Sequence, residues 1–365
     1  MVCSDYELNH VEQIVQMCLS SFSALLSIVG SSLLIYIIIC GGWAKICRVH
    51  SRILLMMSII DVLSSFAFGL GSLPTPRDVT CAYGYGNYST CSAQGFFIQL
   101  GLSVPAYNAM MAIYFLAMIR YNMDETCFIR KAEPYLHAIV LIPTLGVASV
   151  GLGQNLYFRD SSQCWINEDE LDGKGRFMII FSLTFGCTSA LILHSCMMSI
   201  YCLLKKRAKI NNAYQDDSHN FSGDDESREL SGIEIAAKEA AYQALLYWIG
   251  YVFSFGPITV VLIGEAITGK PINNKYVQFV IAFTFPLQGF WNILAYTRPR
   301  ISLLQKENPD FSFVSAMIHI ISSAKGERRR SRPSHSRGIQ TRNNASEFGT
   351  VLEIDSISEI GSIVT

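Results

Sequence analysis

Seven long apolar stretches divide this chain, and short polar segments separate them. A helix rises about 1.5 Å per residue, so about 20 apolar residues cross a hydrocarbon core about 30 Å thick. Runs this long and continuous indicate helices and not the alternating strands of a membrane barrel. The fold class is therefore an all-α integral membrane protein, a seven-transmembrane helix bundle. The expected spans are 14–40, 53–73, 95–119, 135–155, 176–204, 240–266 and 276–297.

Composition agrees with a protein of the bilayer. Hydrophobic residues make up 50% of the chain, charged residues only 16%, and the mean hydropathy is +0.31. The formal net charge is −1, so nothing in the charge balance favours nucleic acid as a partner. We expect the membrane as the environment and no nucleic acid among the partners.

The distribution of lysine and arginine sets the orientation. If residues 1–13 and the segments after spans 2, 4 and 6 lie outside, only six basic residues fall on them or at their edges, and the other 22 of 28 lie inside. This is a clear positive-inside bias. It predicts an extracellular N-terminus and a multi-pass protein of the plasma membrane. Since no basic stretch precedes span 1, we interpret that span as a retained signal anchor.

The polar segments on the inner side have different expected structures. Beyond the transmembrane domain (14–300), residues 205–238 carry a basic start and an acidic middle, which favours a flexible cytosolic loop flanked by helical extensions. Residues 301–325 are expected to form an interfacial amphipathic helix on the inner leaflet. The tail 326–365, rich in serine and arginine, is expected to be disordered. The interfacial helix is suggested by apolar residues at near-helical spacing, namely Phe311, Val314, Ile318 and Ile321.

Four cysteines fall in the outer segments: Cys3, Cys81, Cys91 and Cys164. An oxidising compartment permits disulfides there, and four cysteines allow three full pairings. The same loop that carries Cys91 has an Asn-x-Ser sequon at Asn87, which predicts glycosylation of an extracellular asparagine.

One acid lies deep within a span. A charge at such a depth costs about 2.5–3.5 kcal/mol on insertion scales, so Asp61 in span 2 has a functional interpretation by default. Its expected partners are Asn108 in span 3, Asn292 in span 7 and the nearby Ser58. Such a set can hold a sodium ion or carry a titrating proton. The alternative is a neutral aspartate in a structural hydrogen-bond network. We expect no other cofactor or metal and no catalytic residue.

Prolines mark where the spans can bend. They occur in span 3 (Pro105), span 4 (Pro143), span 6 (Pro257) and span 7 (Pro286). Each removes a helix hydrogen bond and permits a kink. Pro257 follows a glycine in the outer half of span 6, so it is a candidate hinge about which the inner half of the span swings. A static kink is the alternative.

Several short motifs lie in the same order on the expected helices. They are Gly30-Ser31, Ser58-Ile59-Ile60-Asp61, Cys91 with Cys164-Trp165, and Leu287-Gln288-Gly289-Phe290-Trp291-Asn292 followed by Tyr296. With these motifs the chain resembles the cyclic-AMP-receptor-like branch of the G-protein-coupled receptors, with some secretin-like features. The resemblance covers about residues 25–300.

The resemblance implies both a function and a disulfide. Its members are receptors, so it implies that an extracellular ligand favours a packing with span 6 displaced, and that a heterotrimeric G protein reads the change on the inner side. It also implies a bridge between Cys91 and Cys164, which closes a loop of about 70 residues and stabilises by about 4 kcal/mol in the chain-entropy model. A pairing of Cys3 with Cys81 is a weaker expectation. The family's span 7 motif falls on Gln288, Gly289, Asn292 and Tyr296.

The chain also departs from the rhodopsin-like pattern. Span 3 ends in Met118-Ile119-Arg120-Tyr121 where that pattern has Asp-Arg-Tyr, and span 7 has no Asn-Pro-x-x-Tyr. Rhodopsin-like activation residues are therefore not carried over. Arg120 is a candidate contact for a G protein, and the alternative is an arginine that marks the membrane border.

Two other classes of seven-helix protein, retinal pigments and membrane hydrolases, need residues that this sequence lacks. A retinal pigment needs a lysine in the middle of span 7, and this span has none. A membrane hydrolase needs clustered ligands, whereas His137 and His194 stand alone in their spans. A transporter or channel that uses Asp61, Asn108 and Asn292 as a polar path remains the alternative to a receptor. The ligand and the class of Gα subunit stay open.

Overall fold

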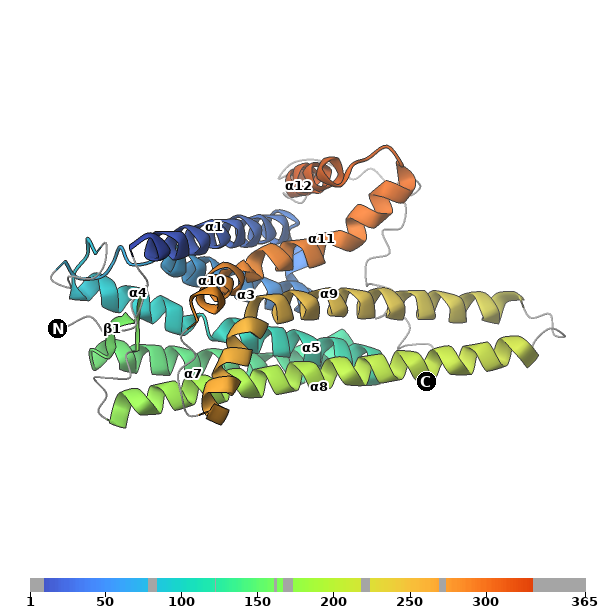
Figure 1. Ribbon diagram of the computed structural model, residues 1–365. Helices are drawn as coiled ribbons and strands as arrows, with labels where there is room; N and C mark the ends of the chain where they lie inside the picture. Colours follow the sequence, from blue (N-terminus) through green and yellow to red (C-terminus); the bar gives the residue numbers. More distant parts are fainter. Residues whose placement is uncertain are drawn as a thin grey trace.

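The structure, a computed structural model, describes residues 10–77, 84–121, 123–160, 163–166, 173–217, 224–268 and 274–330. It is a helical bundle with one small hairpin of strands (Figure 1). The elements are α1 (His10–Cys40), α2 (Trp43–Ile46), α3 (Val49–Gly69), α4 (Tyr88–Leu100), α5 (Ser103–Tyr121), α6 (Glu125–Lys131), α7 (Glu133–Gly153), β1 (Tyr157–Asp160), β2 (Gln163–Ile166), α8 (Gly173–Asp217), α9 (Asp224–Thr268), α10 (Lys275–Thr284), η1 (Phe285–Leu287), α11 (Gln288–Glu307) and α12 (Phe313–Arg330).

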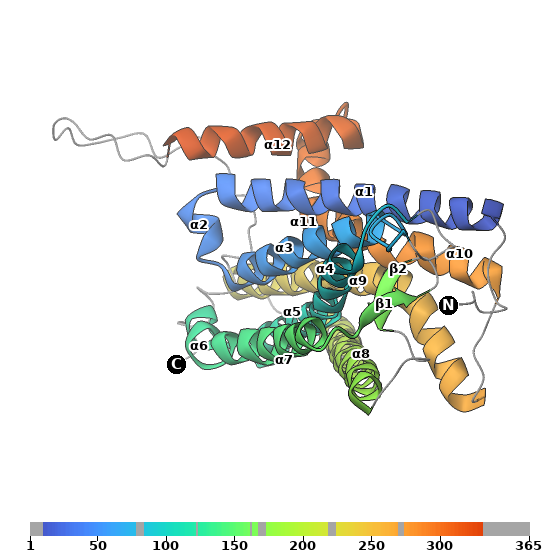
Figure 2. The ribbon, with the colours of Figure 1, turned by 90° about the vertical axis from the view of Figure 1, so that its left-hand side faces the viewer.

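The seven expected spans are confirmed: the described residues contain seven helices long and apolar enough to cross a bilayer. Spans 1, 2, 4, 5 and 6 are α1, α3, α7, α8 and α9, span 3 is α4 with α5, and span 7 is α10 with η1 and α11. The third span lies at the centre, because 83% of its most apolar window is buried against 22% in spans 4 and 5. Figure 2 shows α4 and α5 surrounded by the other helices.

Spans 3 and 7 are interrupted, which hydropathy alone does not reveal. Between α4 and α5 the helix breaks at Gly101, and Pro105 then lies in the first turn of α5, where its missing amide costs little. Span 7 passes through the single 3₁₀ turn η1, which contains Pro286. Pro143 and Pro257 instead lie inside continuous helices.

Helix α9 bends sharply between a long inner segment and a short outer one (Figures 1 and 2). Pro257 is the proline inside this helix, and a proline removes one backbone hydrogen bond and clashes with the preceding turn. The bend therefore has an identifiable cause in the sequence. The kink expected at this position is present.

The polar segment 205–238 differs from the loop expected there. Helix α8 continues to Asp217 and α9 begins at Asp224, each with 45 residues, so most of this segment is helix. The two helices project together from one end of the bundle (Figure 1). The helical extensions expected here are present, and they are longer than expected. Polar helices of this kind satisfy their backbone internally, whatever the hydropathy of their side chains.

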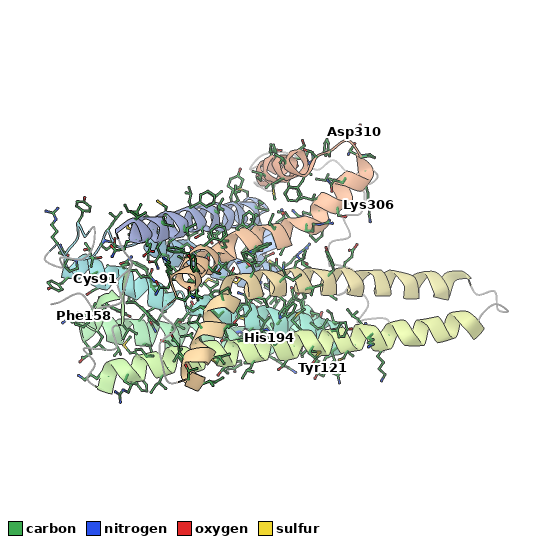
Figure 3. The ribbon with its side chains drawn as sticks, viewed as in Figure 1. Cys91, Tyr121, Phe158, His194, Lys306 and Asp310 are labelled. Carbon is green, nitrogen blue, oxygen red and sulfur yellow. A yellow bond between two sulfur atoms is a disulfide. The ribbon has the colours of Figure 1, made fainter. Side chains whose placement is uncertain are left out.

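The helix expected after span 7 is present, but its boundaries differ. α11 continues to Glu307, the chain turns back near Lys306 and Asp310, and α12 begins only at Phe313 (Figure 3). α12 packs on α1 and α11 through a stripe of buried residues, namely Ala316, Ile320 and Ala324. The tail from residue 331, like Cys3 and Cys81, lies outside the described residues.

The short hairpin of β1 and β2 covers one end of the bundle and lies against α4. Its Tyr157 ring fills a space left by Gly95 and Gly151, at each of which a methyl group would lie within 2.6 Å of the ring or its hydroxyl. The hydroxyl donates to the carbonyl of Ala148 over 3.0 Å, and burial raises the pKa of this phenol. We call this the outer end, following the charge bias, and the end with the projecting helices the inner end.

Candidate functional site

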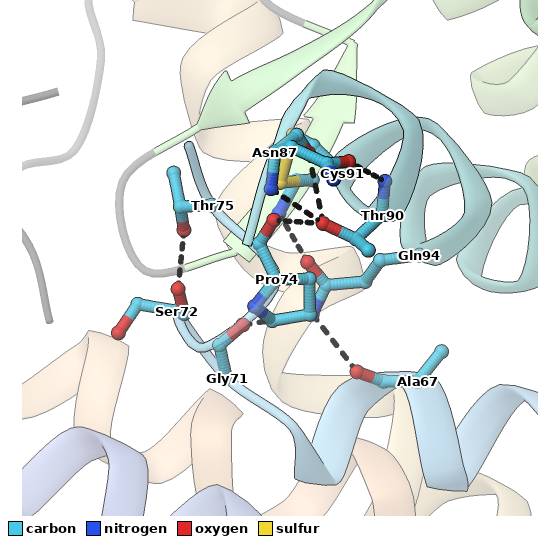
Figure 4. The surroundings of a disulfide bond; sticks show 10 residues. Ala67, Gly71, Ser72, Pro74, Thr75, Asn87, Thr90, Cys91 and Gln94 are labelled. Atoms are coloured by element: carbon cyan, nitrogen blue, oxygen red, sulfur yellow. Dashed lines mark hydrogen bonds between the residues drawn. A yellow bond between two sulfur atoms is a disulfide. The ribbon is translucent and has the colours of Figure 1, made fainter. Parts of the chain in front are cut away.

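A disulfide joins Cys91 of α4 to Cys164 of β2, across 73 positions of sequence. The bridge that the resemblance implied is confirmed. Beside it, the Gln94 amide donates to the carbonyls of Ala67 and Gly71 over 2.9 and 2.8 Å and accepts from the Cys164 amide over 2.9 Å (Figure 4). One buried side chain thus links span 2, span 3 and the hairpin, in addition to the covalent bond.

A second glutamine extends this connection to span 5. The Trp165 indole donates to Gln99 Oε1 over 2.8 Å, and Gln99 Nε2 donates to Ser182 Oγ of α8 over 2.8 Å. Gln99 is buried, and both its amide oxygen and its amide nitrogen have a hydrogen-bond partner within the protein, as buried polar groups usually do. The outer hairpin is therefore attached to spans 2, 3 and 5 by specific polar contacts.

Asn87 lies at the start of α4 and is exposed. Its side-chain oxygen accepts from the amide of Thr90 over 3.0 Å, and Thr90 Oγ1 accepts from the Asn87 amide over 2.8 Å, so the pair forms a capping box. The position is compatible with the expected glycosylation, which stays a prediction.

Asp61 is the centre of a junction between spans 1, 2 and 7. Its Oδ2 accepts from Ser27 Oγ over 2.8 Å and from Ser31 Oγ over 2.7 Å, both on α1. Ser27 Oγ in turn accepts from the amide of Gly289 over 2.8 Å. Gly289 is the second residue of α11, whose first amides have no partner within the helix, so the serine satisfies a donor that the break in span 7 exposes.

The expected partners Asn108 and Asn292 form a neighbouring cluster instead. Gln288 Nε2 donates to Asn292 Oδ1 over 2.9 Å and to Asn108 Oδ1 over 3.3 Å. The structure does not bring either asparagine into a hydrogen bond with Asp61, within the residues it describes. The two clusters nevertheless touch, because Gln288 and Gly289 are adjacent in the chain.

The bundle holds several buried polar atoms that have no partner in the described part of the protein. Each of these atoms is expected to bind water, because an unpaired buried donor or acceptor is costly. They are Gln16 Oε1, Ser58 Oγ, Trp248 Nε1, Ser254 Oγ, Gln288 Oε1, Trp291 Nε1 and Asn292 Nδ2.

A small cavity of about 20 Å³ lies beside Asp61, with room for one water-sized occupant. Its polar lining is Asp61, Ser64 and Ser65, and its outer wall includes the rings of Phe68, Phe255 and Phe285. The Phe285 ring lies 4.8 Å from Phe68 and 5.3 Å from Phe255, measured between centroids. Aromatic rings from spans 2, 6 and 7 thus close the cavity beside the carboxylate.

Nearer the inner end, spans 2, 3, 6 and 7 meet around His50. The buried imidazole stacks on Tyr296 at 5.9 Å and contacts Phe115 at 5.7 Å, between ring centroids. Its Nε2 lies 3.4 Å from the hydroxyl of Tyr247 on α9. Tyr296 belongs to the expected span 7 motif, and in the structure its ring stacks on that of His50.

Arg120 is the second-last residue of α5, at the inner edge of the bundle, and its side chain is exposed. Its guanidinium lies over the ring of the neighbouring Tyr121, 5.7 Å from the centroid. Figure 3 shows Tyr121 far from Cys91, along the length of span 3. Arg120 is therefore accessible at the inner face, as a residue that contacts a partner must be.

The comparisons with known proteins give a likeness of structure and none of sequence. A scan against protein-family models and a search of curated proteins find no match. Among solved structures the chain is similar to squid rhodopsin, with a TM-score of 0.62 and 13% sequence identity, over 92% of this chain and 97% of that one. At this identity the likeness concerns the fold alone. The chain is thus a multi-pass membrane protein with a seven-helix fold like that of squid rhodopsin.

Proposed function

We propose that this chain is a cell-surface receptor of the cyclic-AMP-receptor-like branch, with secretin-like features, which passes an extracellular signal to a heterotrimeric G protein. The outer hairpin is held to spans 2, 3 and 5, so a ligand bound there has a rigid connection into the bundle. Glycosylation at Asn87 would accompany a position in the plasma membrane.

The contact of span 6 with His50 carries this proposal. Tyr247 is the α9 residue that reaches the His50 cluster, through one long hydrogen bond and ring contacts to His50 and Phe115 at 5.9 and 6.4 Å. These contacts of Tyr247 are few and its hydrogen bond is long, so a second packing of α9 can replace them with other contacts. A ligand that favours a second packing therefore needs to supply only the difference in free energy between the two packings.

Displacement of the inner part of α9 is the proposed signal. Pro257 weakens the helix between its two segments, so the inner segment can move while the outer one keeps its contacts. The movement would uncover the inner face next to Arg120, where a Gα subunit would bind. The ligand itself and the class of Gα subunit are left open by this proposal.

A sodium ion beside Asp61 is part of the proposal. The cavity has room for one small ion, and Asp61, Ser64 and Ser65 offer it oxygen atoms, the ligands that such hard cations prefer. Asn108 and Asn292 do not line the cavity, so they would act through Gln288 and not as ligands. An ion there would supply positive charge to a carboxylate that is otherwise held by serine hydroxyl groups.

Guanine-nucleotide exchange tests the receptor. The full chain in membranes would be mixed with a panel of Gα subunits, without added ligand, beside Arg120→Ala and, as a control on the same helix, Tyr121→Phe. We expect basal exchange that Arg120→Ala abolishes and Tyr121→Phe preserves. The His50→Leu variant, in which the span 6 contact is weakened, would serve as the activated form if the unliganded protein is silent.

Absence of exchange from both the native chain and the His50→Leu variant, on every Gα subunit, would overturn the proposal. Flux of small ions through vesicles containing the protein would then favour the transporter or channel. In that case Asp61→Asn should abolish the flux, because Asp61 is the acid of the proposed polar path.

A further inference from the structure

A chain of four polar residues crosses spans 2, 3 and 4 near the inner side, and the proposed receptor activity does not use it. Arg52 of α3 binds Glu133 of α7 with two bonds, Nε to Oε1 and Nη2 to Oε2, each 2.6 Å long. His137 Nε2, one turn along α7, lies 3.7 Å from Glu133 Oε1. On the other side of the ring, His137 Nδ1 lies 3.0 Å from the Tyr107 hydroxyl of α5.

The chemistry of these partners fixes where the hydrogens lie on a neutral ring. Glu133 is ionised against a guanidinium, so its oxygens only accept, and we assign the hydrogen to Nε2, the nitrogen that faces this carboxylate at 3.7 Å. The neutral imidazole of His137 is therefore protonated at Nε2 and has its lone pair at Nδ1. Tyr107 then donates its hydroxyl hydrogen to Nδ1.

We propose that His137 is a proton-binding site facing the inner side, in which a proton and the Tyr107 hydroxyl compete for Nδ1. The side chain of His137 is 21% exposed and lies one turn from the start of α7, at the inner edge of the bundle. Proton binding forms an N–H bond at Nδ1 and turns the Tyr107 hydroxyl from donor to acceptor. The resulting imidazolium faces Glu133 Oε1, which Arg52 already occupies.

Arg52 connects this site to the first inner loop, residues 41–48. Its Nη1 donates to the carbonyls of Ile46 and Cys47 over 3.1 and 2.5 Å. An imidazolium at His137 attracts Glu133 Oε1. The Arg52 guanidinium then shares this carboxylate with His137, so the hydrogen bonds from Arg52 to the loop carbonyls change as well. The protonation state of His137 is thus transmitted to the inner face of the bundle.

The other charged groups near α7 come from neighbouring elements. α6 packs on α7 and carries Glu125, Arg130 and Lys131. In the described part of the chain, no ion pair links these three residues to His137 or Glu133. Glu125 is instead engaged with the backbone amide of Val49, over 2.8 Å. The groups that set the proton affinity are therefore Tyr107, Glu133 and, through Glu133, Arg52.

Nitrogen NMR of the full chain in bilayers, labelled at histidine, tests the site, with the His137 signals assigned by their loss in His137→Gln. At a fixed pH of about 6.5, we expect the neutral ring to carry hydrogen on Nε2. Glu133→Gln should lower the ratio of charged to neutral ring by about tenfold, as loss of a nearby carboxylate does. Tyr107→Phe should raise the ratio, because the competing donor is gone.

The opposite directions of these two changes separate a built site from an ordinary exposed histidine. Tyr201→Phe, an exposed tyrosine on α8, is the control and should leave the ratio unchanged. If Glu133→Gln does not fold, Tyr107→Phe alone decides. A ratio that Tyr107→Phe leaves unchanged, or hydrogen found on Nδ1 of the neutral ring, would overturn the proposal.

Transmission to the loop has its own readout, which does not require G-protein coupling. Amide hydrogen exchange of residues 43–49 would be compared at pH 6 and pH 8 after correction for the intrinsic rates. We expect a residual difference in the native chain that disappears in His137→Gln and persists in His194→Gln, whose ring binds a carbonyl of its own helix. A difference that survives in His137→Gln would show that the loop responds to another group.

Discussion

Gly30 of α1 and Gly289 of α11 lie backbone against backbone, so that a methyl group on Gly30 would be 2.6 Å from the carbonyl oxygen of Gly289. A methyl group on Gly289 would in turn collide with Ser31 Oγ and Asp61 Oδ2. The two glycines therefore allow the close approach that the Asp61 junction requires. Small residues at helix contacts serve this purpose in membrane proteins.

We expect Gly289→Ala to destabilise the protein by about 1–3 kcal/mol, the usual cost of overpacking. The alanine must separate α1 from α11, and the Ser27 and Asp61 hydrogen bonds lengthen with the separation. Thermal unfolding in detergent measures the effect. Gly146→Ala is the matched control, because nothing lies within 4 Å of a methyl group there. Equal melting temperatures for the two variants would contradict the close packing.

Replacing Cys91 and Cys164 together by serine should cost about 4 kcal/mol, the chain-entropy figure for a loop of this length. The Gln94 and Gln99 hydrogen bonds remain in this variant, so it should fold at low temperature and melt early. The comparison is with Cys47→Ser, an exposed free cysteine, which should melt like the native chain. Treatment with a reductant should lower the melting temperature of the native chain and leave the double variant unaffected.

Sodium should raise the melting temperature of the native chain relative to the same concentration of choline. The stabilisation follows from mass action on a site that exists only in the folded state. In Asp61→Asn the charge is gone, and we expect the sodium effect to vanish. Ser21→Ala, an exposed serine of α1 that bonds the Gly69 carbonyl, is the control and should keep the effect. A response to sodium that Asp61→Asn retains would place the ion elsewhere.

His50→Leu should raise basal nucleotide exchange about fivefold, the factor that corresponds to about 1 kcal/mol for one buried hydrogen bond. The change removes the Tyr247 partner, which holds α9 against span 2, and the stacking on Tyr296, which joins span 2 to span 7. Tyr242→Phe, on the same helix but 49% exposed, should leave basal exchange unchanged. Slower exchange in His50→Leu would mean that the cluster stabilises the active packing and not the resting one.

The sequence predicts the seven spans well, because a bilayer imposes a simple rule on length and apolar content. It predicts the partners of Asp61 poorly. The clue is present in span 1, where Ser20, Ser23, Ser27 and Ser31 recur at helical spacing and all four are buried. Hydropathy treats serine as nearly neutral, so a polar stripe of this kind does not interrupt an apolar run.

Two further residues were missed for related reasons. His50 was placed before span 2, since the span was taken to begin at residue 53, whereas α3 begins at Val49. Gln94 lies just before the start predicted for span 3, and its role depends on the carbonyls that the end of span 2 offers. A side chain's partners across helices depend on the three-dimensional packing, which no local pattern contains.

The length of α9 turns its bend into a lever. Asp224 and Pro257 are 33 positions apart, so the inner segment is about 50 Å long. A rotation of only about 6° at the bend would move the far end by about 5 Å, roughly one helical turn. In the proposed receptor, rearrangement of a few side chains around His50 would therefore displace the inner end of α9 by a distance that a protein partner can distinguish.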